Sequence, residues 1–534
     1  MVNSRGGSFS SRSPPNIMGT RRRMQTAIKR EIKNICDRYF AKAAAAEKTA
    51  REYRERFEKR TGVAALVSGA AASAYPDRHF DPKYCKRNAN FLSKTIWHKV
   101  QSGQYKPRPA IHFQIDKPGG GKRDIMAFSI PDSALANVLM RRIRERNLKR
   151  FSPHSFAYHP DKNIFDAVLD LRGYIISTDK VYAVQIDFTN YFESIPSALL
   201  RNLMNDRELL IMTDAEKAAV REFMFHQFAQ RNEYALGTFG TRRRGTPQGS
   251  SISLLLANLA NHNLDVRLEK MPGKFVRFAD DVTAVCGSYE SAVAIEGCFH
   301  EHCRETGISI NAGKSPGIAI LSEKVAEIRT TASIDYLGYR FTPKGLTLSD
   351  TTIKRVKRRI SRLMDIYLIN CIKKVALNSY RVDSVAGYDW DLLGLITEIR
   401  NYLYGGLSEA ELNAMMYDGK KLKKMRGLMS FYALLDEKAS LAALDGWLVN
   451  TMKRVTRKRD KILKSKYGAS GLTPSERDLI MGTWIDPTNW RGEAKADFRL
   501  PSFQRGWRAA RKYYFTFGLK DVVPPKYGYQ YSNT

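Results

Sequence analysis

Cysteine is scarce in this chain: the 534 residues include six, and no two of them form a CxxC pair. Such usage excludes a disulfide-stapled scaffold and is typical of a reducing compartment. Residues 298–303 read CFHEHC, and helical spacing would place Cys298 and His302 on one face. No second ligand pair with zinc-finger spacing accompanies them. Buried free cysteine is the favoured interpretation, and a zinc site is the alternative.

Long apolar runs are also missing. No run reaches the roughly 18 residues that a membrane-spanning helix needs, and the nearest candidate, residues 64–74, is short and rich in Gly, Ser and Ala. Residues 1–23 contain no apolar segment of the kind found in a secretory signal. These absences exclude a membrane-spanning or secreted class, and we expect a cytoplasmic protein with no membrane partner.

Acidic residues are heavily outnumbered, with 54 Asp and Glu against 88 Lys and Arg and a formal net charge of +34. An excess of this size favours a polyanionic partner such as nucleic acid. Residues 1–20 are rich in Ser, Gly, Pro and Arg, and we expect them to be disordered. The Ala-, Lys-, Arg- and Glu-rich stretch 21–61 predicts one or two basic helices, which either contact RNA or are merely solvated.

Two adjacent acids organise the rest of the chain. In residues 274–285, Asp280 and Asp281 separate two short apolar runs, a pattern that predicts a β-hairpin with the acids at its tip. Upstream, residues 181–187 predict a strand that ends in Asp187. An acid at a strand end and an acid pair on a nearby hairpin can converge on two metal ions about 3.5–4 Å apart, the arrangement for in-line phosphoryl transfer. Carboxylates suit Mg²⁺. A solvated Asp-Asp turn is the alternative for an isolated pair.

Further motifs stand in a fixed order around these acids. A Pro247-Gln248-Gly249 loop, followed by Ser253 and Asn258, opens an apolar helix over 252–264, and the stretches 308–315 and 336–341 follow the acid pair. These five blocks together resemble the palm of a reverse transcriptase, and the resemblance covers about residues 100–365. It is closest to bacterial enzymes of the group II intron and retron-like lineage, in particular the stand-alone, defence-associated ones of the abortive-infection and unknown groups.

The resemblance implies an α+β, right-hand polymerase fold with fingers, a palm built on an antiparallel sheet and a helical thumb, flanked by helical N- and C-terminal extensions. The boundaries that it implies are an N-terminal extension over 1–95, fingers over 96–180, a palm over 181–345, a thumb over 346–465 and a C-terminal extension over 466–534. The activity implied is that of an RNA-directed DNA polymerase, a nucleotidyltransferase.

The resemblance also implies roles for individual residues. Asp187 and Asp280 would hold two Mg²⁺ ions, with Mn²⁺ as a substitute, and Asp281 would assist them. A predicted hairpin over 110–125 is similar to the fingers hairpin of the family, which assigns Lys117 and Arg123 to the triphosphate of the incoming nucleotide.

Four more residues would shape the nucleotide pocket. Phe192 stands where the family places a bulky residue that excludes the 2′-hydroxyl of ribonucleotides, and ordinary core packing is the alternative for this ring. Gln248 would line the pocket, and Gly249 would let the backbone approach the nucleotide closely. Lys314 occupies the family's position near the leaving pyrophosphate and is a candidate general acid.

A strongly amphipathic helix is predicted from Asp350 onward, with an apolar stripe on one face and cations on the rest. We expect it to belong to the thumb and to contact nucleic-acid phosphates. The charge run 453–466 continues this basic character. The cations of the predicted helix are Lys354, Arg355, Lys357, Arg358, Arg359 and Arg362.

The C-terminal segment carries a cluster of tyrosines: Tyr513 and Tyr514, then Tyr527, Tyr529 and Tyr531 beyond a Pro-Pro pair. A tail hydroxyl activated by the metals would serve as a primer for DNA synthesis. Packing, base stacking or a subunit contact is the favoured alternative for such a cluster.

The function implied is synthesis of DNA from dNTPs on an RNA template, a dedicated non-coding RNA, in bacterial anti-phage defence. A homo-oligomer is compatible with the sequence. One alternative is a maturase-like protein that folds an RNA of a group II-type element. Another is template-independent DNA synthesis by the same palm.

Overall fold

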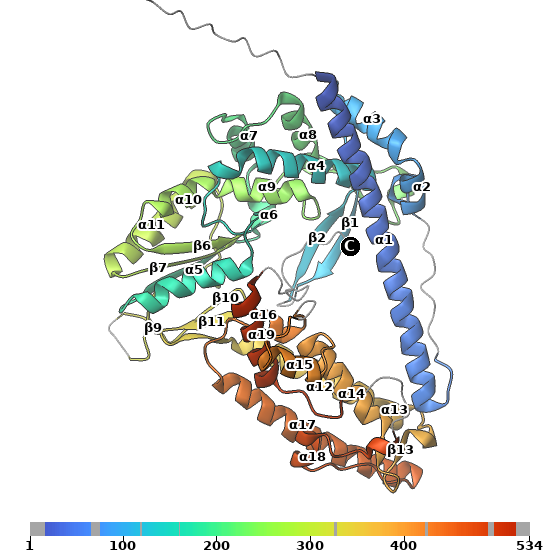
Figure 1. Cartoon of the computed structure of the whole chain (residues 1–534). Coiled ribbons are helices and arrows are strands. Elements are labelled where there is room, and N and C mark those ends of the chain that lie inside the picture. Colours follow the sequence, from blue (N-terminus) through green and yellow to red (C-terminus); the bar gives the residue numbers. More distant parts are fainter. Residues whose placement is uncertain are drawn as a thin grey trace, which may run out of the picture.

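The computed structural model describes residues 17–65, 75–117, 120–157, 159, 161–324, 328–421, 425–489 and 496–519, without the side chains of 17–22 and 489. Three lobes are arranged along one side of a long helix (Figure 1). The upper lobe holds helices and a β-hairpin, the sheet lobe holds the acid pair, and the helical lobe lies below them. The long helix, α1 (Ile17–Thr61), runs from the upper lobe to the helical lobe.

The upper lobe is a helical layer with a small sheet. The hairpin predicted over 110–125 is present as antiparallel β1 and β2, and β1 also pairs in parallel with β4. Helix α4 packs between α1 and α9. The elements are α2 (Pro82–Arg87), α3 (Ala89–Gln101), β1 (Ala110–Asp116), β2 (Lys122–Ala127), α4 (Ile130–Asn147), α6 (Tyr191–Ser194), α7 (Ser197–Asn205), α8 (Asp214–Met224), β4 (Gln227–Gln230), β5 (Gly240–Thr241) and α9 (Ser251–Ala260).

The sheet lobe is built on five strands in the order β6-β7-β3-β8-β9. The predicted antiparallel arrangement holds for every pair except β8 and the two-residue β9, which run parallel. A second sheet, β10-β11-β12, connects the lobe to the next one. The elements are α5 (Ile164–Ser177), β3 (Tyr182–Asp187), α10 (His262–Glu269), β6 (Lys274–Phe278), β7 (Asp281–Cys286), α11 (Tyr289–Thr306), β8 (Gly317–Leu321), β9 (Thr330–Thr331), β10 (Ile334–Tyr336), β11 (Tyr339–Thr342) and β12 (Gly345–Leu348).

Both faces of the central strand β3 are buried, because its alternating side chains enter two different cores. Tyr182, Val184 and Ile186 join the core shared with the upper lobe. Ala183, together with Val181 just ahead of the strand, joins the core shared with α5 and the helical lobe. A strand covered on both faces reads as a nearly continuous apolar run. The strand end that carries Asp187 is thereby fixed between two cores.

The helical lobe begins with α12, which Ser349 caps by accepting a hydrogen bond from the Thr352 backbone at 3.2 Å. Val356, Ile360 and Met364 form its buried stripe, as predicted. Helix α19 packs against α15, α16 and α17, so this part of the C-terminal segment shares the core of the lobe. The elements are α12 (Asp350–Met364), a π-helix (Asp365–Asn370), α13 (Cys371–Lys374), β13 (Val382–Asp383), β14 (Tyr388–Asp389), α14 (Trp390–Tyr404), α15 (Glu409–Met416), α16 (Leu428–Phe431), α17 (Ala439–Tyr467), α18 (Glu476–Met481) and α19 (Phe503–Phe517).

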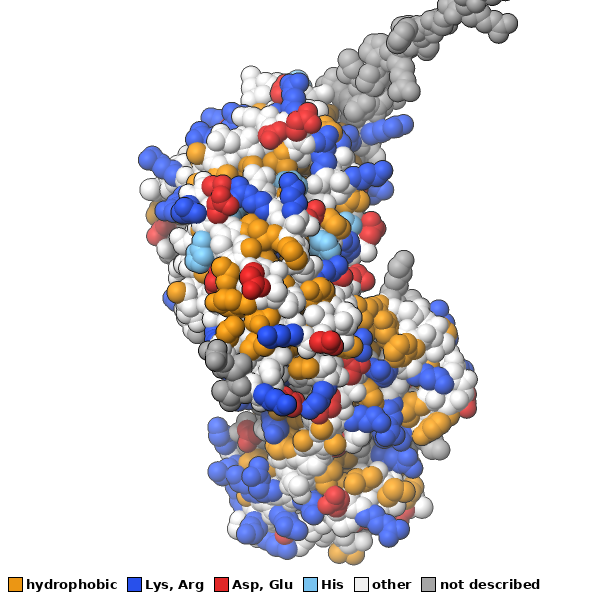
Figure 2. All heavy atoms as spheres, turned by 90° about the vertical axis from the view of Figure 1, so that its left-hand side faces the viewer, with side chains coloured by type: hydrophobic (Ala, Val, Ile, Leu, Met, Phe, Trp, Pro, Cys, Tyr) orange, Lys and Arg blue, Asp and Glu red, His pale blue; other side chains and the backbone are white. Residues whose placement is uncertain are grey.

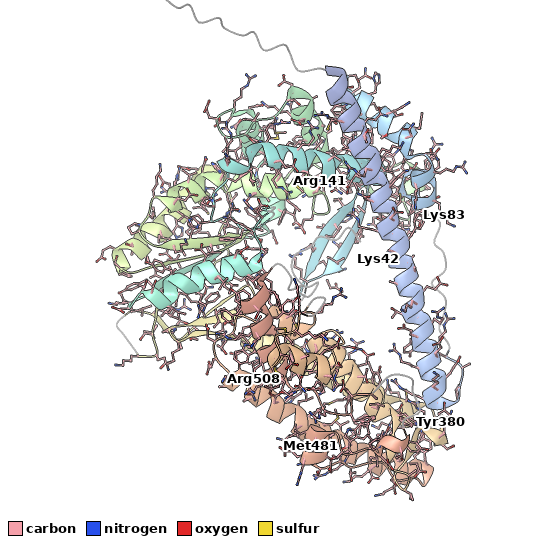
Figure 3. All side chains as sticks on the ribbon, in the orientation of Figure 1. Lys42, Lys83, Arg141, Tyr380, Met481 and Arg508 are labelled. Carbon is pink, nitrogen blue, oxygen red and sulfur yellow. The ribbon has the colours of Figure 1, made fainter. Side chains whose placement is uncertain are left out.

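Helix α1 is the single helix into which the predicted basic stretch folds, and it is anchored only near its two ends. Ile28, Ile32 and Ile35 are buried against the upper lobe, and Glu31 accepts a hydrogen bond from Arg141 of α4 at 2.8 Å (Figure 3). All of residues 41–49 are exposed. Near the far end, the Lys59 carbonyl accepts a hydrogen bond from Tyr380 at 3.1 Å. The alanine-rich middle therefore holds its helix by propensity alone.

Because the middle of α1 lacks packing, a helix breaker there should separate its two ends. We expect Ala45→Pro to cost about 3 kcal/mol of helix stability, and Ala45→Gly about 1 kcal/mol. Tryptic cleavage after Lys42 and Lys48 reports the opening of this span. Cleavage should be roughly 100-fold faster in Ala45→Pro than in the parent and only several-fold faster in Ala45→Gly. Equal cleavage of all three proteins would contradict a free-standing helix.

Within the part of the chain that the structure describes, no helix is both long enough and apolar enough to cross a membrane.

Candidate active site

Three carboxylates stand at one end of the five-stranded sheet. Strand β3 ends at Asp187 and β7 begins at Asp281, and these two residues are directly opposite each other in the antiparallel register. Phe278 pairs with Asp281, so Ala279 and Asp280 form a two-residue turn between β6 and β7. Opposed residues in an antiparallel pair have Cβ atoms about 4.5–5.5 Å apart. The sequence-predicted hairpin and strand thus bring Asp187, Asp280 and Asp281 together.

The tight turn depends on a buried arginine. Ala279 has a φ of +64°, a left-handed conformation that costs a residue with a side chain roughly 1–2 kcal/mol. Such a conformation persists where the surroundings impose it. Arg277 is fully buried, and its guanidinium donates to the Ala279 carbonyl at 3.0 Å and to the Asp265 carboxylate at 2.7 Å. Arg277 therefore positions the turn that carries Asp280.

Arg277 also ties together motifs that are distant in sequence. It donates to the Asn258 side-chain oxygen at 2.7 Å, and Ser155 donates to the same oxygen at 2.7 Å. Tyr336 supports the hairpin from the other side, because its hydroxyl donates to the Asp281 carbonyl at 3.1 Å. The sequence motifs around Asn258 and Tyr336 thus have structural roles here. The sequence motifs did not point to Arg277 or Asp265, although a charged residue inside the apolar strand β6 was a signal for Arg277. Asp265 lies on α10 and had no such signal.

The loop after α11 encloses Asp187. The Ser315 hydroxyl accepts a hydrogen bond from the Asp187 backbone at 3.0 Å, and the Asn311 backbone donates to the Asp187 carbonyl at 2.8 Å. The Lys314 ammonium lies 3.2 Å from the Asp187 carboxylate, and the lysine side chain is 70% exposed. The cation predicted for this neighbourhood is therefore in direct contact with one of the three acids.

Burial and mutual repulsion make it difficult for Asp280 and Asp281 to lose their carboxyl protons. Burial, followed by the nearby charges of Asp280 and Asp187, raises the pKa of Asp281 to about 7. Burial is also the largest cause of the raised pKa of Asp280, whereas the charges of Arg123 and Lys314 act to lower it. Three neighbouring carboxylates of this kind are stabilised by a cation.

The donor set fits Mg²⁺, which takes oxygen ligands and usually one or two protein carboxylates. Asp187, Asp280 and Asp281 supply such oxygens at the end of one sheet. Over the described residues, however, no three His, Cys, Asp or Glu side chains are gathered closely enough to hold a metal ion as they stand. We therefore propose metal binding by these three carboxylates only for the site in which the acids are deprotonated and the ion is bound.

The loop with Gln248 and Gly249 is locked onto the β1–β2 hairpin. The Gln248 carbonyl accepts a hydrogen bond from the Met126 backbone at 2.8 Å. Gly249 has a φ of +116°, and a Cβ there would lie 2.3 Å from the Met126 carbonyl oxygen, so only glycine fits. The side-chain oxygen of Gln248 is buried without a hydrogen-bond partner among the described residues. A buried acceptor of this kind is costly unless a bound group satisfies it.

The hairpin carries the two cations predicted to bind a triphosphate. Arg123 lies on β2, near enough to Asp280 to influence its pKa. The Lys117 backbone donates to the Gly121 carbonyl at 2.9 Å and closes the end of the hairpin; residues 118–119 of its turn lie outside the described residues. The structure thus places Arg123 beside the acid cluster and Lys117 at the hairpin tip.

Phe192 lies on α6, next to the same loop. Its carbonyl accepts a hydrogen bond from the Thr246 backbone at 2.7 Å. A Cβ at Gly245 would lie 2.6 Å from the Phe192 carbonyl oxygen, so the loop runs directly against this residue. The ring is 6% exposed and belongs to the core shared with the upper lobe. This position agrees with a ring that excludes the 2′-hydroxyl of ribonucleotides, and it agrees equally with a ring that only packs in the core.

The cations predicted for the thumb lie on α12 as expected. Lys354, Arg355, Arg358, Arg359 and Arg362 are exposed, while Lys357 is half-buried. The Lys357 ammonium lies 5.5 Å from the centre of the Trp447 ring. Figure 2 shows Lys and Arg side chains gathered over the helical lobe. On α17 a groove of about 450 Å³ is lined by Asn450, Lys453, Arg454, Arg457, Lys458 and Lys461.

The remaining candidates from the sequence are the C-terminal tyrosines and the Cys298–His302 pair. Tyr527, Tyr529 and Tyr531 lie outside the described residues. Tyr513 is fully buried in α19, so its hydroxyl is not free to act as a primer. Cys298 and His302 are both buried, and a ring nitrogen of His302 lies 3.0 Å from the Asn261 side-chain oxygen. Asn261 also separates α9 from α10, where the sequence predicted one helix.

Residues 115–341 match the family model described as "Reverse transcriptase (RNA-dependent DNA polymerase)", which covers less than half of the chain. This match confirms a reverse transcriptase domain with the α+β polymerase fold predicted from the sequence.

The curated relatives align over about a third of the chain. A protein of COX1/OXI3 intron 2 from Saccharomyces cerevisiae is 23% identical over 34% of this chain and 20% of its own length. An uncharacterized 91 kDa protein in a cob intron of Schizosaccharomyces pombe is 26% identical over 34% and 21%. Protein YkfC of Escherichia coli is 21% identical over 32% and 44%. This chain therefore spans less than half the length of each of these relatives.

Solved telomerase structures share a distant likeness. Truncated apo telomerase from Candida tropicalis has a TM-score of 0.35 at 12% identity, covering 49% of this chain and 60% of its own. Telomerase from Candida albicans in complex with a TWJ fragment of telomeric RNA has a TM-score of 0.38 at 13% identity, covering 72% and 67%.

Proposed function

We propose that this chain, which carries a reverse transcriptase domain over residues 115–341, is an RNA-directed DNA polymerase. The observation that carries the proposal is the convergence of Asp187, Asp280 and Asp281 at one sheet end. Arg123 lies near Asp280, and the buried Gln248 acceptor belongs to a loop that is hydrogen-bonded to the same hairpin as Arg123. In this assignment the fingers span 96–180, the palm 181–345 and the thumb 346–465. The palm then includes the sheet lobe's strands up to β11 together with α6 to α9 of the upper lobe, and the thumb lies in the helical lobe.

When bound, two Mg²⁺ or Mn²⁺ ions would activate the attacking 3′-hydroxyl and neutralise the triphosphate. Asp187 and Asp280 are the proposed ligands, and Asp281 supports them from the opposite register position. Arg123 and Lys117 would bind the triphosphate, and the Gln248 side chain would accept a hydrogen bond from the nucleotide. Lys314 would release Asp187 to the metal and donate a proton to the departing pyrophosphate.

The test is extension of a DNA primer on an RNA template by the purified chain. Extension that requires dNTPs, a divalent metal and the RNA supports the proposal. RNA binding without any incorporation would favour a maturase-like protein instead, and single-dNTP extension without a template would favour template-independent synthesis.

Phe192 provides a prediction about sugar selection. If its ring blocks the 2′-hydroxyl, Phe192→Val should raise incorporation of ribonucleotides relative to deoxyribonucleotides by about 10- to 100-fold, because removing a steric clash acts on one substrate only. The measurement is the ratio of kcat/KM for dNTP and NTP in the parent and the variant. Tyr191→Phe alters the neighbouring residue without enlarging the pocket and serves as control. An equal loss for both nucleotides would assign Phe192 to core packing.

The net charge of +34 predicts salt-sensitive RNA binding. If six or more phosphates are contacted, affinity should fall by roughly 10³- to 10⁵-fold between 50 and 200 mM salt. Arg358→Glu on α12 should weaken binding to many sequences alike and flatten the salt dependence. Lys83→Glu on α2 is the matched control, since Lys83 is also exposed but lies on the outer side of the molecule (Figure 3). A flat salt response would assign the basic surface to another partner.

We further propose that the template is a dedicated non-coding RNA, that the enzyme is cytoplasmic and that it serves bacterial anti-phage defence. A monomer and a homo-oligomer both agree with this proposal. The support is the sequence resemblance to stand-alone enzymes of the group II intron and retron-like lineage. Sequencing the nucleic acid that copurifies with the protein tests this directly: one abundant small RNA agrees with the proposal, and random cellular RNA contradicts it.

A further inference from the structure

A cavity of about 520 Å³ lies where the far end of α1 meets the helical lobe. Its walls come from α1, α12, the π-helix, α13 and α14. The junction is firmly built: Arg60 pairs with the buried Asp391 at 3.4 Å, and its guanidinium lies 3.8 Å from the centre of the Tyr367 ring. Arg56 pairs with Glu398 at 3.2 Å. The cavity is therefore part of a fixed contact between segments more than 300 positions apart.

The lining combines positive charge with aromatic rings. Arg362 and Lys374 line the cavity and have no acidic partner among the described residues. Tyr53 also lines it, is 49% exposed, and stacks on Phe57 with ring centres 6.1 Å apart. Unmatched cations beside an exposed aromatic ring suit a phosphate and a stacked base. The chemistry of the cavity is that of a nucleotide unit.

The cavity is continuous with the cation row of α12. Lys354, Arg358 and Arg362 recur every fourth residue on one exposed face, and the row spans about 12 Å along the helix. α12 starts directly after β12, in the sheet whose Tyr336 contacts the Asp281 carbonyl. A strand that follows these cations away from the candidate active site would reach the cavity. This continuity favours a nucleic-acid strand over a free nucleotide.

We propose that the cavity between α1 and the helical lobe binds an unpaired segment of RNA, with a base on Tyr53 and phosphates on Arg362 and Lys374. The inference rests on the proposed function for the direction of the strand, but the binding itself requires no catalysis. Base-paired nucleic acid does not fit, because stacking on Tyr53 requires a base that is free of its neighbours.

The test measures RNA binding to the full chain without dNTPs or metal, by fluorescence anisotropy. Tyr53→Ala combined with Lys374→Ala should weaken binding of an unstructured labelled RNA by about 10- to 100-fold. Binding of a blunt RNA–DNA duplex should change less than about twofold. The matched control is Tyr417→Ala combined with Lys42→Ala: Tyr417 is 71% exposed, Lys42 lies in the middle of α1, and neither lines the cavity (Figure 3).

Equal losses of affinity for the unstructured RNA and the RNA–DNA duplex, or no loss for either, would overturn the proposal. Displacement of the labelled RNA by micromolar AMP would overturn it too, by assigning the cavity to a free nucleotide. A second measurement avoids variants altogether: ultraviolet cross-linking of 4-thiouridine RNA to the parent protein should modify the peptide with Tyr53 or the one with Lys374, and cross-links found only elsewhere would contradict the site. If the parent protein makes no DNA but its RNA binding still depends on Tyr53, the proposed polymerase function is wrong and the proposed RNA site in the cavity is retained.

Discussion

Replacing Asp280 or Asp281 by alanine should lower the rate of dNTP incorporation by about 10³-fold or more. A lost metal ligand removes several kcal/mol of transition-state stabilisation, and each 1.4 kcal/mol is a factor of ten in rate. The fold should tolerate the change, since the pKa of Asp281 is raised to about 7. A raised carboxyl pKa means that the charged form is less stable in the folded protein than in the unfolded chain. Above pH 7 and without metal, the melting temperature should therefore stay the same or rise.

Asp179→Ala is the control for this pair, because Asp179 is an exposed acid just ahead of β3 and should affect neither property. Single-turnover incorporation and thermal melting are the measurements. Incorporation near the parent rate in a double Asp280→Ala, Asp281→Ala chain would show that the site is assigned wrongly. Loss of incorporation with loss of folding would assign these acids to stability instead.

The second large effect concerns the buried pair under the turn. Arg277→Ala or Asp265→Ala should lower the free energy of unfolding by about 3–5 kcal/mol, because either change leaves an uncompensated buried charge. Arg277→Met combined with Asp265→Leu should cost less than either single change, since no charge then remains. The measurement is urea unfolding, in which the free energy of unfolding and the m-value are determined for each variant.

Arg267→Ala provides the contrast. Arg267 pairs with Glu301 and Glu305 at the surface, at 3.3 and 2.7 Å, and exposed pairs contribute about 0–1 kcal/mol. If Arg277→Ala and Arg267→Ala cost the same, the buried pair does not hold the turn in place. A selective loss of activity in Arg277→Ala at temperatures where it stays folded would agree with its positioning of Asp280.

Local pattern was sufficient to predict the elements of the candidate site. The hairpin with Asp280 and Asp281, the strand that ends in Asp187 and the hairpin with Arg123 each depend on short apolar alternation and turn residues. The buried stripe of α12 follows from helical spacing in the same way. Each of these signals is contained within about twenty residues, and no distant contact was needed to read it.

Contacts between distant segments were not predictable from one sequence. Ser155 and Asn258 are 103 positions apart, and Arg56 and Glu398 are 342 positions apart. The role of Arg277 depends on the contact between Ser155 and Asn258, and the anchoring of α1 depends on the contact between Arg56 and Glu398. The sequence predicted a basic helix over the N-terminal stretch, but the exposure of its middle and the docking of its end appear only when the helical lobe is folded beneath it.

The most direct test of the central claim is the sequence of the DNA that the purified chain makes. The chain is given a defined RNA template, an annealed DNA primer, all four dNTPs and Mg²⁺, and the product is sequenced. The account predicts DNA complementary to the RNA up to its 5′ end, and no product when the RNA is left out. A homopolymer, a product unrelated to the template, or no product in the presence of metal and tightly bound RNA would contradict it.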